Sequence, residues 1–252
     1  MNRTRIDWSD YTWNPVVGCR HACPYCYGRR VAERGLGEYG KWPKGERFQP
    51  RLLEDRLDDP KKLLTPATIF VGSMCDLFGS WVPLDWIRQV LDVVEACPWH
   101  TFIFLTKNPL RYLQMAYLGL GFPQNAWVGY TLTDVQGLRS VNLGVPVQGG
   151  KSLLAGKRFI SFEPLGQKGG PQITMPLVAR NYRITEDGPD FRLDFQGIDW
   201  IIIGGLSGKG EQPKRELVEF LVERAHAQGI PVFMKRNLEP TWGPDLVQEW
   251  PA

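Results

Sequence analysis

Short apolar segments recur along the chain and constrain its fold more than any other feature. They are rich in Ile, Val, Phe and Trp and contain few polar residues. A continuous rather than alternating apolar pattern is typical of strands that are buried on both faces, as in a parallel sheet. The predicted strands are Thr68–Ser73, Thr101–Thr106, Ala126–Leu132, Arg158–Phe162, Trp200–Gly204 and Pro231–Lys235.

Segments with helical periodicity lie between these strands. Leu84–Ala96 and Pro213–Gln228 each place their apolar residues on one face, and Gly229 then ends the second helix. Pro109–Tyr117 begins with a proline, which is favoured in a first helical turn. Alternation of strands and helices predicts right-handed βαβ units and therefore a parallel α/β sheet or barrel.

The length of 252 residues, 43% of them hydrophobic, allows a single domain over residues 1–252. Two segments interrupt the alternation. Residues 35–66 form a polar, basic excursion, in which Arg47, Arg51 and Arg56 are interleaved with acidic residues and are expected to lie on a solvated surface. Residues 165–197 are expected to contain an inserted β-hairpin that turns near Asp187 and Gly188.

Charge and hydropathy limit the partners and the location. The net charge of +3 is compatible with a nucleic-acid or phosphorylated partner without requiring one. The N-terminal residues lack the apolar core of a signal peptide, and no apolar run approaches the roughly 20 residues of a membrane span. We therefore expect a soluble, cytoplasmic protein without a membrane partner.

Polar residues gather directly after the predicted strands. In parallel α/β folds the carboxyl ends of the strands form the site, so we expect these side chains to converge. They are Ser73, Asp76, Thr106, Lys107, Thr131 to Asp134, Glu163, Ser207, Lys235 and Arg236.

Three of the five cysteines, Cys19, Cys23 and Cys26, lie on one short loop. Clustered thiols in a reducing compartment indicate metal binding or catalysis more often than disulfides. A structural zinc site needs four ligands, and Cys75 or Cys97 offers a fourth thiolate. A 4Fe-4S cluster held by only three thiolates instead leaves one iron open to a small molecule. Both alternatives remain open on spacing alone.

The segment CRHACPYC has the C-x3-C-x2-C spacing of the radical S-adenosyl-L-methionine (SAM) superfamily and resembles it closely. Tyr25, just before the last cysteine, matches an aromatic that lies near the SAM adenine in that superfamily. The segments IDWSDYTWNPVVGC, FVGSMCDLF, TFIFLTKNP, WVGYTLTD, RFISFEPL and IDWIIIGGLSG together resemble a phage and bacterial three-Cys-motif family of radical SAM-like proteins. The resemblance runs from about Ile6 to Arg236.

The resemblance implies a partial (β/α)6, TIM-barrel-like fold of about six parallel strands, with the cluster loop after a short first strand just before Cys19. It also implies a 4Fe-4S cluster whose open iron binds S-adenosyl-L-methionine. Reductive cleavage of SAM would give a 5′-deoxyadenosyl radical that abstracts a hydrogen from a substrate. An electron donor such as flavodoxin or ferredoxin would then be a partner.

The resemblance also implies positions that contact SAM. They fall on Ser73 and Asp76 after the second strand, Thr131 or Thr133 after the fourth, Ser161 or Glu163 after the fifth, and Gly204 and Gly205 after the sixth. The superfamily's glycine-glycine-glutamate motif is absent in plain form. Lys107 and Cys75 are the catalytic candidates, Cys75 as a packed thiol, a fourth ligand or a hydrogen donor.

The substrate is not specified by these motifs. A nucleic acid or nucleotide is the first expectation, and a peptide, a small metabolite or a separate partner protein are alternatives. The competing functional hypothesis is a zinc-stabilised or Fe-S binding or sensor protein without SAM chemistry.

Overall fold

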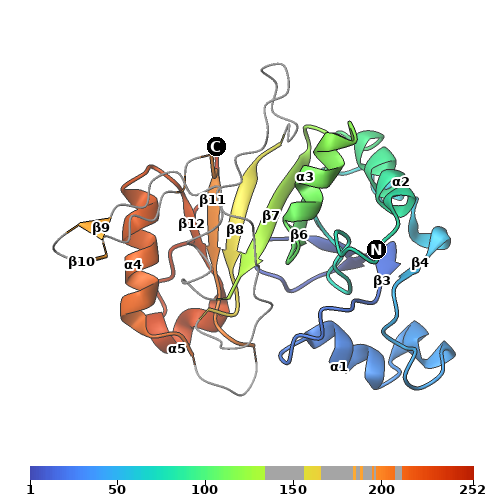
Figure 1. The fold of residues 1–252 in the computed structure, drawn as a ribbon, viewed down its shortest axis with the longest axis horizontal. Helices are drawn as coiled ribbons and strands as arrows, with labels where there is room; N and C mark the ends of the chain where they lie inside the picture. Colours follow the sequence, from blue (N-terminus) through green and yellow to red (C-terminus); the bar gives the residue numbers. More distant parts are fainter. Residues whose placement is uncertain (134–155, 166–183, 186–187, 190–194, 196, 208–211) are drawn as a thin grey trace. The chain divides into compact units, whose positions relative to one another are not determined.

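The computed structural model describes residues 1–133, 156–165, 184–185, 188–189, 195, 197–207 and 212–252. The chain divides into two compact units, each treated separately below. The first comprises Met1–Tyr130 and Val145–Lys157, and the second comprises Thr131–Gly144 and Arg158–Ala252. Both combine mostly parallel strands with helices, so the α/β prediction is confirmed (Figure 1).

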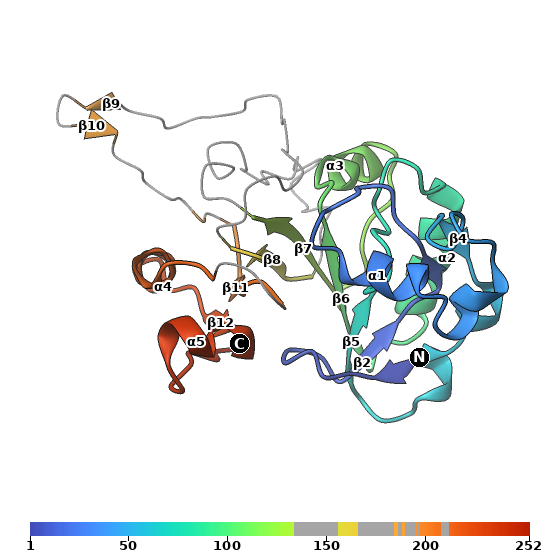
Figure 2. The ribbon, with the colours of Figure 1, turned by 90° about the horizontal axis from the view of Figure 1, so that it is seen from below.

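The main sheet of the first unit has the strand order β1-β2-β5-β6-β7 (Figure 2). Within this sheet β1 and β2 are antiparallel, whereas β2, β5, β6 and β7 run parallel to one another. The bounds are β1 Asn2–Arg3, β2 Tyr11–Trp13, β5 Thr68–Val71, β6 Thr101–Thr106 and β7 Ala126–Leu132. The carboxyl ends of β5 and β6 are therefore neighbours, because paired parallel strands end at the same edge.

Two helices pack against this sheet. α2 (Leu84–Glu95) buries Ile87, Val90 and Val94, and α3 (Leu110–Tyr117) buries Tyr112 and Met115. These side chains form one apolar core with aromatic residues of the strands, including Trp13, Phe102 and Phe104. Burial of apolar residues from both helices and strands gives this unit its stability, at about 25 cal/mol per Å² of apolar surface.

A smaller apolar cluster supports the three-cysteine loop. β3 (Val16–Val17) pairs antiparallel with β4 (Arg51–Leu52), and α1 (Tyr27–Glu33) follows Cys26. Val17, Ala32, Tyr39 and Phe48 form the buried centre of this cluster, and Cys19 and Cys26 pack against it. Turns of 3-10 helix at Gly37–Lys41, Glu54–Arg56 and Pro60–Lys62 complete the polar excursion.

The second unit has three parallel strands in the order β8-β11-β12, at Arg158–Phe162, Trp200–Ile203 and Val232–Met234. The helices of this unit are α4 (Arg215–His226), between β11 and β12 in the chain, and α5 (Glu239–Trp242), after β12 (Figure 1). Trp200 contacts both Phe159 and Phe233 and stacks on Trp250 at a centroid distance of 4.9 Å. Phe159, Trp200 and Phe233 are buried and form the aromatic part of its core, whereas Trp250 is exposed.

The prediction for the first strand was wrong in position. The parallel strand is β2, which ends at Trp13, whereas the valines nearest Cys19 form β3 and pair antiparallel with β4. α1 was not predicted. The hairpin prediction agrees with the antiparallel pairing of β9 (Ile184–Thr185) with β10 (Gly188–Pro189), and most other residues of 165–197 lie outside the described residues. The single domain over 1–252 stays a prediction. Each helix in the described ranges is too short or too polar to cross a membrane.

Candidate functional site

The three-cysteine loop is fixed to its surroundings by backbone hydrogen bonds. Gly18 N donates to Met74 O at 3.0 Å, and Cys19 N donates to Phe48 O at 3.2 Å. Gly18 has φ +85°, and a Cβ built on it would lie 2.2 Å from Gln49 O, so only glycine fits here. Ala22 adopts a left-handed φ of 54° between the first two cysteines. The loop therefore follows a tightly specified path.

The thiols of the loop influence one another. Burial, with added repulsion from Asp76, Cys26 and Cys23, raises the pKa of Cys19 to about 12, although a backbone hydrogen bond at His21 opposes the shift. Burial also raises the pKa of Cys23, against the opposing charge of Lys107. Cys26 Sγ accepts a hydrogen bond from Arg29 N at 3.3 Å in the first turn of α1. Without a bound cation the Cys19 thiol thus keeps its proton at neutral pH, and metal binding would displace it.

Cys75 lies beside this loop rather than in it. Gly18 and Cys75 form an isolated parallel bridge. Burial, followed by the charges of Asp76 and Cys19, raises the pKa of the Cys75 thiol well above its ordinary value. The predicted proximity of Cys75 to the cluster loop agrees with these contacts, and a neutral, packed thiol is the state they favour.

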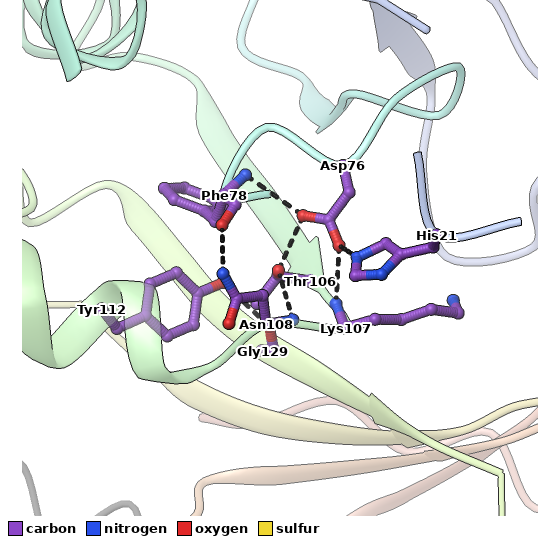
Figure 3. A network of polar contacts seen from close by, with 8 residues as sticks. All are labelled: His21, Asp76, Phe78, Thr106, Lys107, Asn108, Tyr112 and Gly129. Atoms are coloured by element: carbon purple, nitrogen blue, oxygen red, sulfur yellow. Dashed lines mark hydrogen bonds and ion pairs between the residues drawn. The ribbon is translucent and has the colours of Figure 1, made fainter. Parts of the chain in front are cut away.

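Asp76 is the centre of a hydrogen-bond network that connects the loop to the sheet (Figure 3). Its side chain is buried, with Oδ2 at 2.7 Å from His21 Nε2 and 2.9 Å from Lys107 N. Its Oδ1 accepts from Thr106 Oγ1 at 2.7 Å and from Phe78 N at 3.1 Å. Because a carboxylate only accepts, His21 donates through Nε2. We call this network the Asp76 clasp.

The pKa of Asp76 reflects the balance within the clasp. Burial raises the pKa, but the hydrogen bond and charge of His21, with the Lys107 amide and the Thr106 hydroxyl, outweigh it and leave the pKa below its ordinary value. The His21 ring also packs edge-on against Trp81 at a centroid distance of 4.8 Å. His21 is thereby held on two sides, by Asp76 and by Trp81. These contacts fix the position of the loop between Cys19 and Cys23.

Lys107 contributes to the clasp through its backbone, which leaves its side chain available. In Figure 3 the ammonium end extends away from the Asp76 carboxylate. Burial raises the pKa of Cys23 overall, and the charge of Lys107 opposes that rise. A cation in this position favours thiolate over thiol and attracts a carboxylate ligand.

Ser73, another predicted SAM contact, is engaged by Asn14. Asn14 Nδ2 donates to Ser73 Oγ at 3.1 Å, and Ser73 Oγ lies 3.2 Å from Asn14 Oδ1. Asn14 Oδ1 also accepts from Met74 N at 2.9 Å. Asn14 thus fixes the turn after β5 from the position directly after β2.

The remaining predicted contacts belong to the second unit, where Glu163 and Lys235 form an ion pair. A Cβ built on Gly204 would lie 3.0 Å from Glu163 Cδ and 3.0 Å from Lys235 Cδ. The close approach predicted at Gly204 is therefore made by these two side chains of the same chain.

Gly205 is paired with Asn237 in a reciprocal arrangement. Gly205 N donates to Asn237 Oδ1 at 3.0 Å, and Asn237 Nδ2 donates to Gly205 O at 2.8 Å. A Cβ on Gly205 would also meet Gln212 Oε1 at 2.1 Å. The side-chain amide therefore pairs with the loop backbone as a neighbouring strand would.

Two of the predicted contacts are buried hydroxyls with no hydrogen-bond partner among the described residues. Thr131 Oγ1 and Ser161 Oγ both have this property, and the two side chains are 4% and 0% exposed. Buried polar atoms are normally paired, so these two hydroxyls have the capacity to bond to a ligand or water. Thr133, by contrast, is half-buried.

Comparison with known protein families decides the family of the chain. Residues 3–247 match the family described as "Protein of unknown function (DUF5131)". The chain belongs to the DUF5131 family. This DUF5131 protein is also 32% identical over 57 residues to the uncharacterized protein MJ0683 of Methanocaldococcus jannaschii, a match that spans 22% of each chain.

Among solved structures, the DUF5131 protein is similar to spore photoproduct lyase. A complex with dinucleoside spore photoproduct aligns with a TM-score of 0.47 at 14% identity, covering 88% of this chain and 62% of that one. A mutant with bound AdoMet and dinucleoside spore photoproduct aligns with a TM-score of 0.41 at 14% identity, covering 65% and 48%. The chain thus spans about half to three fifths of the solved structures that it matches, and about a fifth of the curated relative.

The ligand atoms of the three-cysteine loop fit an iron or zinc group that is bound by thiolates. Its three thiols are partly accessible, and they are close enough to repel one another as thiolates. Within the described ranges, no three His, Cys, Asp or Glu side chains are already gathered as metal ligands.

Sequence reasoning missed the residues that anchor the loop. His21 was visible only as a residue between two cysteines, and Asp76 was expected to bind SAM rather than His21. Both act across 55 residues of sequence, a separation that no local pattern encodes. The available signal was the position of Asp76, Thr106 and Lys107 at the ends of adjacent strands, and the structure brings these three together as predicted.

Proposed function

We propose that this protein is a radical S-adenosyl-L-methionine enzyme in which Cys19, Cys23 and Cys26 hold a 4Fe-4S cluster. When bound, the cluster would supply the electron that cleaves SAM into methionine and a 5′-deoxyadenosyl radical, which abstracts a hydrogen atom from the substrate. The observation that carries the proposal is a three-thiol loop with C-x3-C-x2-C spacing, fixed by the Asp76 clasp at the carboxyl ends of β5 and β6.

The residues of the chain have distinct roles in this proposal. The Asp76 clasp orients the loop, since its carboxylate is saturated by protein donors. The Lys107 ammonium, whose charge acts on the Cys23 thiol, is suited to the carboxylate of SAM. The orphaned hydroxyls of Thr131 and Ser161 support the proposal that they bind polar atoms of SAM. Tyr25 remains the proposed neighbour of the adenine.

The reaction requires an external electron donor, for which a flavodoxin or ferredoxin is suitable, and a substrate, for which we favour a nucleic acid or nucleotide. A separate partner protein that presents the substrate is compatible with this scheme. The protein is proposed to act in the cytoplasm, where reducing conditions keep the thiols available.

One observation favours a second candidate, a zinc-stabilised binding protein. Cys75 forms a backbone β-bridge with Gly18, and the charge of Cys19 contributes to its raised pKa. A fourth cysteine is therefore near the loop. Four thiolates would close a tetrahedral zinc site and leave no position for SAM.

The test is SAM cleavage by anaerobically reconstituted protein with dithionite. Wild type should release 5′-deoxyadenosine, and Cys23→Ala should release none. Cys97→Ala is the matched control, because Cys97 is buried in the core of the first unit and should tolerate loss of its thiol with cleavage retained. Absence of deoxyadenosine from wild type that holds a full cluster would contradict the proposal.

A further inference from the structure

The positive charge of the protein is concentrated in one segment. Residues 20–51 contain eight Lys and Arg but only three Glu, a net charge of +5, whereas the whole chain has +3. The rest of the chain is therefore slightly acidic, with a net charge of −2. This segment includes the end of the three-cysteine loop, α1 and the start of the polar excursion, so the asymmetry is located at the proposed cluster.

The cations of this segment fall into two groups, and the first group is used by the fold. Arg29 donates to Cys19 O and lies over the Phe48 ring. Arg47 donates to the carbonyls of Trp42 and Glu33. Arg51 donates to the carbonyls of Glu46 and Gln49 and lies over the ring of Trp42. These arginines stabilise the excursion and are not available to a partner.

The second group has no such role. Its five side chains are exposed and make no hydrogen bond or ion pair to any residue that the structure describes. Cations that the fold does not use and no acid neutralises retain their full attraction for an anionic partner. The group consists of Arg20, Arg30, Arg34, Lys41 and Lys44.

These free cations follow the course of α1. Tyr27, Arg30 and the C-cap residue Arg34 are three and four residues apart, so they lie on one side of α1, and all three are exposed. The opposite face buries Gly28 and Ala32. Tyr27 is 66% exposed, an unusual state for a large aromatic side chain that follows directly after a proposed ligand.

Further free cations lie near both ends of α1. At its start, the bond from Arg29 Nη2 to Cys19 O at 3.4 Å keeps the loop that carries Arg20 against the helix. At its end, a Cβ built on Gly40 would lie 2.8 Å from Gly35 O, so the chain leading to Lys41 returns beside Arg34. We call Tyr27, Arg30, Arg34 and Lys41 the α1 strip.

We propose that the α1 strip binds the sugar-phosphate backbone and an unpaired base of a single-stranded nucleic acid. Guanidinium groups bind phosphate oxygens in bidentate fashion, and an exposed tyrosine provides a face on which a base can stack. The strip begins at the residue after Cys26, so a strand bound there lies next to the three-cysteine loop. That the bound nucleic acid is also the substrate of the enzyme rests on the proposed function. That it binds to the α1 strip does not depend on the proposed function.

Binding is tested by fluorescence anisotropy of a labelled 20-nucleotide single strand, as DNA and as RNA, without SAM or reductant. The strip variant is Arg30→Gln, Arg34→Gln and Lys41→Gln combined. The control variant combines Lys61→Gln, Lys62→Gln and Arg88→Gln, which removes the same charge from exposed positions of the same unit. The strip variant should raise Kd at least about tenfold, and the slope of log K against log salt should weaken by about 2, since each lost phosphate contact accounts for about 0.7.

Tyr27→Ala should weaken binding of a single strand by about fivefold or more while changing duplex binding less, because stacking requires an unpaired base. Single variants of Arg30 and Arg34 should each show part of the effect, which guards against misfolding of the triple variant. The proposal is overturned if wild type binds no single strand, or if the control variant weakens binding as much as the strip variant.

The same variants distinguish nucleic acid from a different anionic partner, an electron donor such as flavodoxin. If the strip variant slows cluster reduction by a flavodoxin but leaves nucleic-acid binding unchanged, the strip is a docking surface for the electron donor and the proposal is wrong. Strong binding of nucleic acid by a protein that takes up no iron on anaerobic reconstitution would instead contradict the proposed function and support the α1 strip.

Discussion

Replacing Asp76 by asparagine is the sharpest perturbation of the Asp76 clasp. The carboxylate accepts four hydrogen bonds, two on each oxygen. Asparagine keeps the shape but offers one accepting oxygen and an NH2 group. Whichever way the amide is turned, that NH2 faces a backbone N–H, either of Phe78 or of Lys107.

The expected cost follows from those two orientations. A buried donor left without an acceptor costs about 1–3 kcal/mol, and the remaining bonds lose the strength that a charged acceptor gives, about 1 kcal/mol more. We therefore expect Asp76→Asn to lower the free energy of unfolding by about 2–4 kcal/mol. This corresponds to a fall in Tm of about 5–15 °C for a unit of this size.

The pKa of Asp76 adds a pH signature. Because that pKa is lower in the folded protein than in the unfolded chain, the carboxylate stabilises the fold above the unfolded pKa of about 3.9. This contribution is lost as the pH falls below about 4 toward the folded pKa. The difference in stability between wild type and Asp76→Asn should accordingly be largest near neutral pH and should shrink toward pH 3.

Urea denaturation of metal-free protein, followed by tryptophan fluorescence, measures this difference. Asp85→Asn is the matched control, because Asp85 is exposed and accepts only from Gln89 in the described structure. Its free energy of unfolding should stay within about 0.5 kcal/mol of wild type. Equal stability of the Asp76 and Asp85 variants would refute the reasoning, as would a difference that does not shrink in acid.

Three further predictions concern the loop and the second unit. His21→Ala should weaken iron retention about tenfold, whereas His21→Gln, which still donates an N–H to Asp76, should approach wild type; equal retention in all three proteins would contradict a positioning role. Cys75→Ser should leave iron content and turnover unchanged, as expected for a packed thiol; loss of iron would identify a ligand, and altered product with deoxyadenosine still formed would identify a hydrogen donor. Asn237→Ala should lower the free energy of unfolding by about 2 kcal/mol in urea, because the buried amide and carbonyl of Gly205 lose their partners; an unchanged midpoint and slope would count against that pairing.

The strands buried on both faces could be predicted from sequence almost to the residue. The apolar runs Thr101–Thr106, Ala126–Leu132 and Arg158–Phe162 coincide with β6, β7 and β8. Their burial requires unbroken apolar character, which is a local signal. β2 escaped prediction because it has only three residues, and Val16–Val17 looked more apolar although they pair with β4.

The site could be predicted in its residue types but not in its pairings. The thiol spacing and the polar strand ends are local features. Contacts such as His21 with Asp76 and Asn14 with Ser73 join residues 55 and 59 positions apart, and they depend on which strands become neighbours. The division of the arginines into structural and free cations likewise depends on carbonyl groups that only the fold brings within reach, as for Arg47 and Glu33.

Metal analysis of protein purified and reconstituted without oxygen tests the central claim most directly. We predict about four irons per chain, with the absorption and reduced-state paramagnetic signal of one 4Fe-4S cluster, and loss of that iron in Cys23→Ala but not in Cys97→Ala. Stoichiometric zinc without iron, retained through Cys19, Cys23, Cys26 and Cys75, would contradict the account.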